Sequence, residues 1–173
     1  MNNPITPPRD GDYPEYFKRY IALVQGEDVL EYFKNQTDSL ASLLISTPSE
    51  KLHYRYAEGK WTIADVAQHL MDTERVFCYR MLTFARGDKA EIAGFEEDEY
   101  ARNVDTSSRT ADSIINEYKS VRAATLTLLE NLDKYAIERS GIANGRRVSV
   151  RALAYMIAGH ELHHLGVIKE RYL

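Results

Sequence analysis

Residues 149–172 read SVRALAYMIAGHELHHLGVIKERY, and this stretch decides the fold class. Its apolar side chains recur at steps of four and three, which is the period of an α-helix. Ser149 is a residue type favoured at helix N-caps and marks the start. His160 and His164 occupy two positions of the stripe that call for Leu or Ile. They lie one turn apart on one face, a spacing at which two imidazoles can share a metal ion. Two core histidines satisfied by other hydrogen bonds are the alternative.

The sequence predicts three further long helices, over 28–45, 62–86 and 110–133. A short helix is expected over 15–24, after an irregular arm at 1–14. Thr62 and Asp65 suit a capping box that starts the helix over 62–86, and Gly87 follows its end. No proline occurs after Pro48 and no sustained alternation of period two is present, so the segment 141–147 is expected to be a turn.

Four long helices predict an all-α four-helix bundle, formed by residues 15–173 as a single domain. The acidic connection over 87–107 is about 20 residues long, where most loops have about four to six. It is expected to be a solvated loop with room for one short helix. A connection this long can cross from one end of the bundle to the other. The second and third helices would then be parallel, and the second and fourth antiparallel.

Composition narrows the class of protein further. Hydrophobic residues make up 44% and charged residues 28% of the chain, which is a globular balance. The net charge of −4 gives no basic stripe for nucleic acid, and no run is long enough to span a membrane. Cys78 is the single cysteine, so no intrachain disulfide can form. With no secretory signal visible, a cytoplasmic location is expected.

His69 is the candidate for a third metal ligand. It lies seven residues after Thr62, and His164 lies eight residues before Tyr172. At about 1.5 Å per residue, these depths match if the two helices are antiparallel. His163 lies off the apolar stripe and His53 lies in an expected loop, so neither is a favoured ligand.

A second pattern competes for the same two histidines. His160-Glu161-Leu162-His163-His164 matches the zincin motif H-E-x-x-H, in which Glu161 would be the general base. Zincins of the extended pattern find their third ligand downstream, and only nine residues follow His164. Glu161 is also expected to face away from the core. The zincin interpretation is therefore the weaker one.

Several other residues near the histidines could take part in chemistry. Glu74 falls within the apolar stripe of its helix, where it could be a general base or could pair with Arg80 or another basic residue. Asp72 and Thr73 lie one turn from His69 and could orient its ring, although Asp72 could equally face solvent. Cys78 is expected to be a small apolar core residue. The glycines at 159 and 166 share one helix face and could admit a close backbone approach, or could simply be tolerated.

Two segments resemble the metal-site segments of the DinB-like, or YfiT-like, superfamily. The first is residues 61–75, WTIADVAQHLMDTER, and the second is residues 157–165, IAGHELHHL. The acidic stretch 94–100, GFEEDEY, is also similar. The resemblance implies an up-down-down-up four-helix bundle, often a homodimer. It also implies a three-histidine site for nickel or zinc, carried over as His69, His160 and His164.

The resemblance implies two kinds of activity. Some relatives are metal-dependent transferases or isomerases that use low-molecular-weight thiols, and others are described as hydrolases. We therefore expect a metal-dependent enzyme of the thiol S-transferase or hydrolase type. Its expected partners are a small-molecule substrate or a thiol cosubstrate, not nucleic acid or a membrane. A non-catalytic metal-binding module for stress response or interaction is the alternative.

Overall fold

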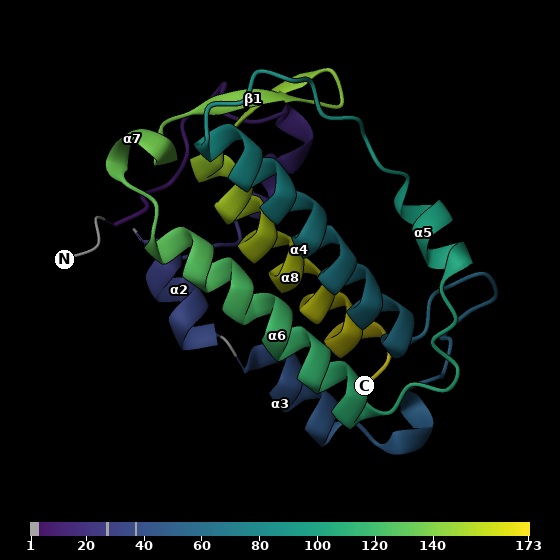
Figure 1. Ribbon diagram of the computed structural model, residues 1–173. Helices are drawn as coiled ribbons and strands as arrows, with labels where there is room; N and C mark the ends of the chain where they lie inside the picture. The colour runs from purple at the N-terminus through teal and green to yellow at the C-terminus, as the bar shows by residue number, and fades with distance from the viewer. Residues whose placement is uncertain (1–3, 27, 37) are drawn as a thin grey trace.

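The computed structural model describes residues 4–26, 28–36 and 38–173, and four helical rods form its body (Figure 1). The first rod is the pair α2 (Val29–Gln36) and α3 (Ser39–Ser46), and the others are α4 (Ile63–Ala85), α6 (Ala111–Glu130) and α8 (Val150–Arg171). In Figure 1, α4 and α6 run parallel to each other, while α8 and the α2–α3 pair run the opposite way. This arrangement confirms the four-helix bundle with up-down-down-up topology.

The capping box predicted at the start of α4 is present. The Thr62 hydroxyl accepts a hydrogen bond from the Asp65 backbone N–H at 3.0 Å, and the Asp65 carboxylate accepts one from the Thr62 N–H at 2.9 Å. The Thr106 hydroxyl donates to the same carboxylate at 2.5 Å, which ties the end of the crossover to this cap. α4 is therefore fixed in register at the end nearest His69.

Some predicted helices are shorter or divided. The helix expected over 28–45 is the pair α2 and α3, with residue 37 outside the described residues; α3 begins after Asp38, a residue type common at N-caps. The helix expected over 110–133 ends at Glu130, because Asp133 starts α7 (Lys134–Ile137) by accepting hydrogen bonds from the N–H groups of Tyr135 and Ala136. The segment 15–24 forms η1 (Glu15–Phe17) and α1 (Lys18–Ile21). Two short elements complete the helices, η2 (Ser49–Lys51) and, in the acidic crossover, α5 (Glu97–Asn103).

The expectation of a plain turn over 141–147 is wrong. This region is an antiparallel hairpin of β1 (Ser140–Ala143) and β2 (Arg146–Ser149). Asn144 and Gly145 join the strands with φ of 52° and 67°, the left-handed conformation that two-residue hairpin turns need. The hairpin covers one end of the bundle and leads directly into α8 (Figure 1).

The buried apolar side chains form two clusters, one towards each end of the bundle. Residues of α4 before position 72 belong to one cluster and those after position 76 to the other, and α8 divides in the same way around position 160. Buried polar side chains occupy the level between them: Thr73, Glu74, Arg122, Thr125, His160 and Glu161. The bundle therefore contains a polar layer at mid-height.

The N-terminal arm packs against the bundle. Residues 1–3 of the arm expected at 1–14 lie outside the described residues, and residues 4–14 form neither helix nor strand. Ile5 is buried, and its carbonyl accepts a hydrogen bond of 3.0 Å from the Tyr155 hydroxyl of α8. Across the described ranges, no helix combines the length and the apolar character needed to cross a membrane.

Candidate metal centre

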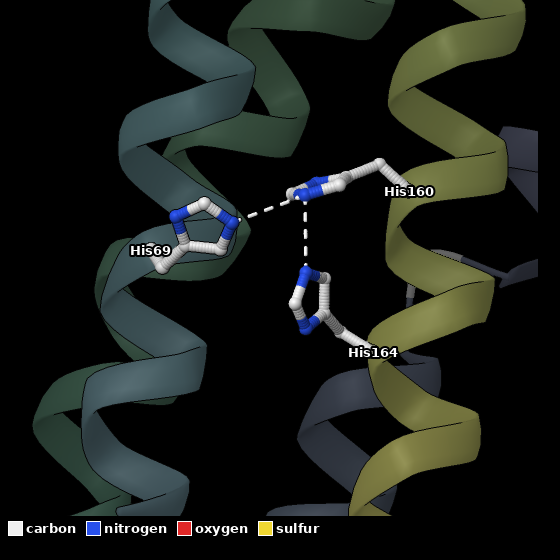
Figure 2. A group of neighbouring side chains, drawn as sticks. All are labelled: His69, His160 and His164. Carbon is white, nitrogen blue, oxygen red and sulfur yellow. Dashed lines mark hydrogen bonds between the residues drawn. The ribbon is translucent and has the colours of Figure 1, made fainter. Parts of the chain in front are cut away.

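The structure brings His69, His160 and His164 together at the interface of α4 and α8. His69 Nε2 lies 3.0 Å from His160 Nε2, and His164 Nε2 lies 3.1 Å from the same atom. Figure 2 shows the three rings pointing toward one another from the two helices. Ligand atoms of all three lie within 4.8 Å of one another. The antiparallel packing of α4 and α8 thus supplies the register that the sequence argument required.

Burial keeps the three imidazoles neutral. It lowers the pKa of His69 to about 4, although the nearby charge of Asp98 acts in the opposite direction. Burial also lowers the pKa of His164 to about 3, with a further contribution from the neighbouring His69 and His163. Burial and the neighbouring histidines also hold the pKa of His160 well below its ordinary value. Neutral imidazole is the form that binds a metal ion.

The geometry of the nitrogens fits a metal ion. Two nitrogens bound to one ion at about 2.0–2.1 Å in a tetrahedral site lie about 3.3 Å apart. The observed separations of 3.0 and 3.1 Å are close to this value. His164 Nδ1 is buried without a hydrogen-bond partner among the described residues, and His160 also lines an open cavity. The residues present therefore fit a divalent ion bound by three nitrogens, with room on the cavity side.

Aromatic rings hold two of the three imidazoles in place. The Trp61 ring lies 4.8 Å from His69, and the Tyr20 ring of α1 lies 5.7 Å from His160, both measured between centroids. Tyr20 also contacts the half-buried His163, 5.1 Å away. His53 lies in a loop, where its Nε2 is 3.1 Å from the Arg109 carbonyl oxygen. Neither His163 nor His53 belongs to the cluster.

Glu161 does not face away from the core, and that expectation was wrong. Its side chain is 2% exposed, and its carboxylate accepts hydrogen bonds from Arg122 and, at 2.6 Å, from the Tyr118 hydroxyl. α8 is surrounded by other elements on nearly all sides, so a residue off the apolar stripe is still buried. A carboxylate engaged in this way has no free oxygen directed at the cavity, which removes the structural basis of the zincin interpretation.

Glu74 is paired with Arg122, and not with Arg80. Its carboxylate accepts from the Arg122 guanidinium at 2.9 and 3.1 Å and from the Thr125 hydroxyl at 2.5 Å. Burial alone would lower the pKa of Arg122, but Glu161 and Glu74 raise it well above the ordinary value. Glu74 and Glu161 line a small void of about 10 Å³ together with His160. Two carboxylates and one guanidinium therefore lie directly beside the histidine cluster.

The remaining predicted residues of α4 take different positions. Asp72 accepts a hydrogen bond of 3.0 Å from Gln68 and lies 3.4 Å from Arg75, so its contacts are with the helix surface. The Thr73 hydroxyl is buried, has no partner among the described residues, and lines the cavity beside His160. The Cys78 thiol contacts Thr125 at 3.0 Å, and burial raises its pKa to about 11, as expected for a core residue.

A cavity of about 430 Å³ opens beside His160. Its walls come from η1 and α1, α4, α5, the hairpin and α8, and they include Tyr20, Arg80 and Asp98. None of these three residues was predicted from the sequence to line a site. The sequence position of Arg80 could have indicated this, because Arg80 lies eleven residues after His69 and therefore on nearly the same face of α4. Nothing in the sequence places Tyr20 or Asp98 at the cavity, since only the fold brings α1 and α5 there.

Comparison with known proteins identifies the family. The sequence profile of the DinB superfamily matches residues 32–168. The chain belongs to the DinB superfamily. The matched part of this DinB-superfamily protein contains all three histidines of the cluster, the whole of α4 and α6, and most of the first and last rods.

Individual relatives agree with this assignment. A protein of Geobacillus thermodenitrificans named "Putative metal-dependent hydrolase" is 26% identical over 152 residues, which are 85% of each chain. The structure of YfiT from Bacillus subtilis, described as a probable metal-dependent hydrolase with an unusual four-helix bundle topology, superposes with a TM-score of 0.69. That match has 17% identity and covers 94% of this chain and 89% of YfiT. A mycothiol-dependent maleylpyruvate isomerase matches with a TM-score of 0.65 and 16% identity, over 84% of this chain and 61% of the isomerase.

Proposed function

We propose that this DinB-superfamily protein is a metal-dependent hydrolase that binds one nickel or zinc ion with His69, His160 and His164. The observation that carries the proposal is the convergence of three neutral imidazoles, two buried and one partly buried, beside a cavity. The name of the Geobacillus relative supports the reaction class. A non-catalytic metal-binding module is less favoured, because its metal site would not need a cavity of this size.

Three protein ligands leave at least one position open, where a bound metal ion activates water or polarises a substrate oxygen. The chain supplies the surroundings for that chemistry. Tyr20 and Trp61 fix two rings, and Thr73 offers a free hydroxyl at the cavity wall. Glu74 is already bonded to Arg122 and Thr125, so we assign it to fixing the polar layer and do not require it as a base.

Thiol transfer is the second candidate reaction. Ligand pockets typically measure about 300–1,000 Å³, so a cavity of about 430 Å³ can hold a small substrate or a low-molecular-weight thiol. The structural likeness to an isomerase described as mycothiol-dependent makes this candidate worth testing. In this version the open position would bind a thiolate in place of water.

Metal content tests the ligand assignment. The purified protein should contain about one divalent ion per chain by elemental analysis after loading and desalting. His160→Ala and His164→Ala should abolish tight binding, and His69→Ala should weaken it by a large factor, because each change removes one metal–nitrogen bond. His53→Ala, at an exposed loop position, is the matched control and should retain the ion.

Activity tests the reaction class. Protein loaded with nickel or zinc should hydrolyse members of an ester and amide panel, and His164→Ala should not. A parallel panel of electrophiles with several low-molecular-weight thiols tests thiol transfer. If all three histidine variants keep wild-type metal content with their folds intact, the metal assignment is wrong. If metal-loaded protein is inactive in both panels, the non-catalytic alternative becomes the better one.

The proposed assembly is a homodimer, as the family resemblance implies. The chain has a mass of 19.8 kDa, so light scattering after size exclusion should give about twice this value. A mass equal to one chain over the accessible concentration range would contradict the dimer without affecting the metal proposal.

A further inference from the structure

Arg80 is a buried cation without a carboxylate partner. Its side chain is 6% exposed, and one Nη group donates a 3.1 Å hydrogen bond to the Ala93 carbonyl. Its Nε–H has no acceptor, and none of the ion pairs among the described residues includes it. Burial lowers the pKa of Arg80, and no nearby carboxylate offsets this effect. Arg122 is even more deeply buried but has two carboxylates, which is the usual condition of a buried charge.

The place of Arg80 in the cavity points to a ligand as the missing partner. Arg80 and His160 line the same cavity. Phe77 and Phe95 flank it, with their ring centroids 5.6 and 5.8 Å from its guanidinium carbon. Aromatic faces stabilise a guanidinium but leave the edge of its plane available for hydrogen bonds to an anion.

The distance between the two ends of the cavity sets the length of that ligand. His69 and Arg80 are eleven residues apart on α4, or about 16 Å along the helix axis. His160 lines the cavity together with Arg80, and its Nε2 lies 3.0 Å from that of His69, so the gap between the histidine nitrogens and the guanidinium is on the order of 10 Å. Apolar side chains line the intervening walls: Phe17, Phe77, Phe95, Val148, Leu153 and Met156. An extended molecule with an apolar middle matches this shape.

The other charged residues at the cavity indicate which kind of anion Arg80 would bind. Glu97 and Asp98 of α5 and its N-cap residue Glu96 lie on the wall, and Arg146 of the hairpin is the second cation. Three carboxylates on the wall of the same cavity disfavour a dianion such as a phosphate monoester. A single carboxylate can accept two parallel hydrogen bonds from the guanidinium with less repulsion from α5.

We infer that Arg80 binds the carboxylate of an extended, largely apolar carboxylic acid, whose far end lies at the histidine cluster. The identity of the reacting end rests on the proposed function. Binding of the carboxylate by Arg80 does not require the metal ion, so the two can be tested separately.

Calorimetric titration of metal-free protein with octanoate and with the neutral octanamide tests the inference directly. Octanoate has about the length of the cavity and lacks any other charged group. Wild type should bind octanoate at least tenfold more tightly than octanamide, and Arg80→Gln should lose this preference. Arg86→Gln, an exposed arginine at the end of the same helix, is the matched control and should keep it.

Each outcome of the titration decides a separate point. Equal affinity of wild type for octanoate and octanamide, or an Arg80→Gln variant that keeps the preference, would overturn the inference. Tighter binding of octyl phosphate than of octanoate would overturn the choice of a carboxylate. If Arg80→Gln fails to fold by circular dichroism, Arg80→Lys replaces it and should bind octanoate more weakly than wild type, because lysine lacks the planar fork. His164→Ala should keep the octanoate preference while losing metal, so failure of the metal proposal is recognised independently.

Discussion

At the scale of single residues, the protein holds three imidazoles close together in their neutral form, because three protonated imidazoles at this distance would repel one another. The unfolded chain takes up a proton on each histidine near pH 6.5, whereas His69 in the fold does so only near pH 4. Between these values the unfolded state binds more protons than the native state. The stability of the metal-free protein must therefore fall as the pH is lowered from about 6.5 to about 4.

This linkage gives a measurable expectation. His69 alone should make the free energy of unfolding about 2 kcal/mol smaller at pH 5 than at pH 7. Urea denaturation of metal-free protein at the two pH values measures the change, and His69→Gln should reduce it. His53→Gln, a substitution at an exposed position outside the cluster, is the matched control. A pH-independent free energy of unfolding over this range would contradict the neutral state of the cluster.

Arg122 is expected to be among the most sensitive residues in the chain. Arg122→Met would leave Glu74 and Glu161 buried without their cation and should destabilise the protein by about 3–5 kcal/mol. Arg75→Met removes an exposed arginine from its pairs with Asp72 and Glu117, and should cost less than about 1 kcal/mol. Urea denaturation at pH 7 compares them. Similar losses for both variants would show that the buried cluster contributes no special stability.

At the scale of elements, the contact of α1 with α8 depends on a missing side chain. A Cβ at Gly159 would overlap the carbonyl oxygen of Tyr20, which is backbone and cannot rotate away. Seven residues further on, Gly166 has nothing within 4 Å of the same position. The close approach considered from the sequence therefore exists at Gly159 and not at Gly166.

The two glycines make a matched pair of substitutions. Gly166→Ala should stabilise the protein by about 0.5–1 kcal/mol, because alanine is the better helix former. Gly159→Ala gains the same helix propensity, but its new methyl group must displace α1, so this substitution should lower the free energy of unfolding. Thermal unfolding of both variants provides the comparison. Equal shifts in the same direction would mean that α1 is not held by this contact.

The elements also show where sequence reasoning succeeds. The start of α4 could be predicted because Thr62 and Asp65 are the residue types of a capping box. The histidine pair could be predicted because a spacing of four residues places His160 and His164 on the same face of a helix. The hairpin was missed although Asn144-Gly145 is a favoured two-residue turn, because its four-residue strands are too short to show alternation. The position of Glu161 could not be predicted, since it depends on Arg122 approaching from α6.

At the scale of the whole molecule, the proposed binding of a metal ion should be coupled to folding. A ligand that binds only the native state at 100 times its Kd stabilises that state by about 2.7 kcal/mol. For a chain of 173 residues this corresponds to a rise in Tm of about 5–10 °C. Differential scanning calorimetry with and without zinc should show this rise in wild type. His164→Ala should show none, and a similar rise in that variant would place the ion elsewhere.

The histidines stand on the long helices of the bundle, whereas α1, α5 and the hairpin supply much of the cavity wall. The first group is fixed by packing on several sides, and the second consists of short elements in connecting segments that tolerate insertion and replacement. Mutations in those segments can reshape the chamber while the three nitrogens keep their spacing. Under the proposed function, evolution could thus exchange one substrate for another without rebuilding the histidine cluster, and a single scaffold could diversify in specificity.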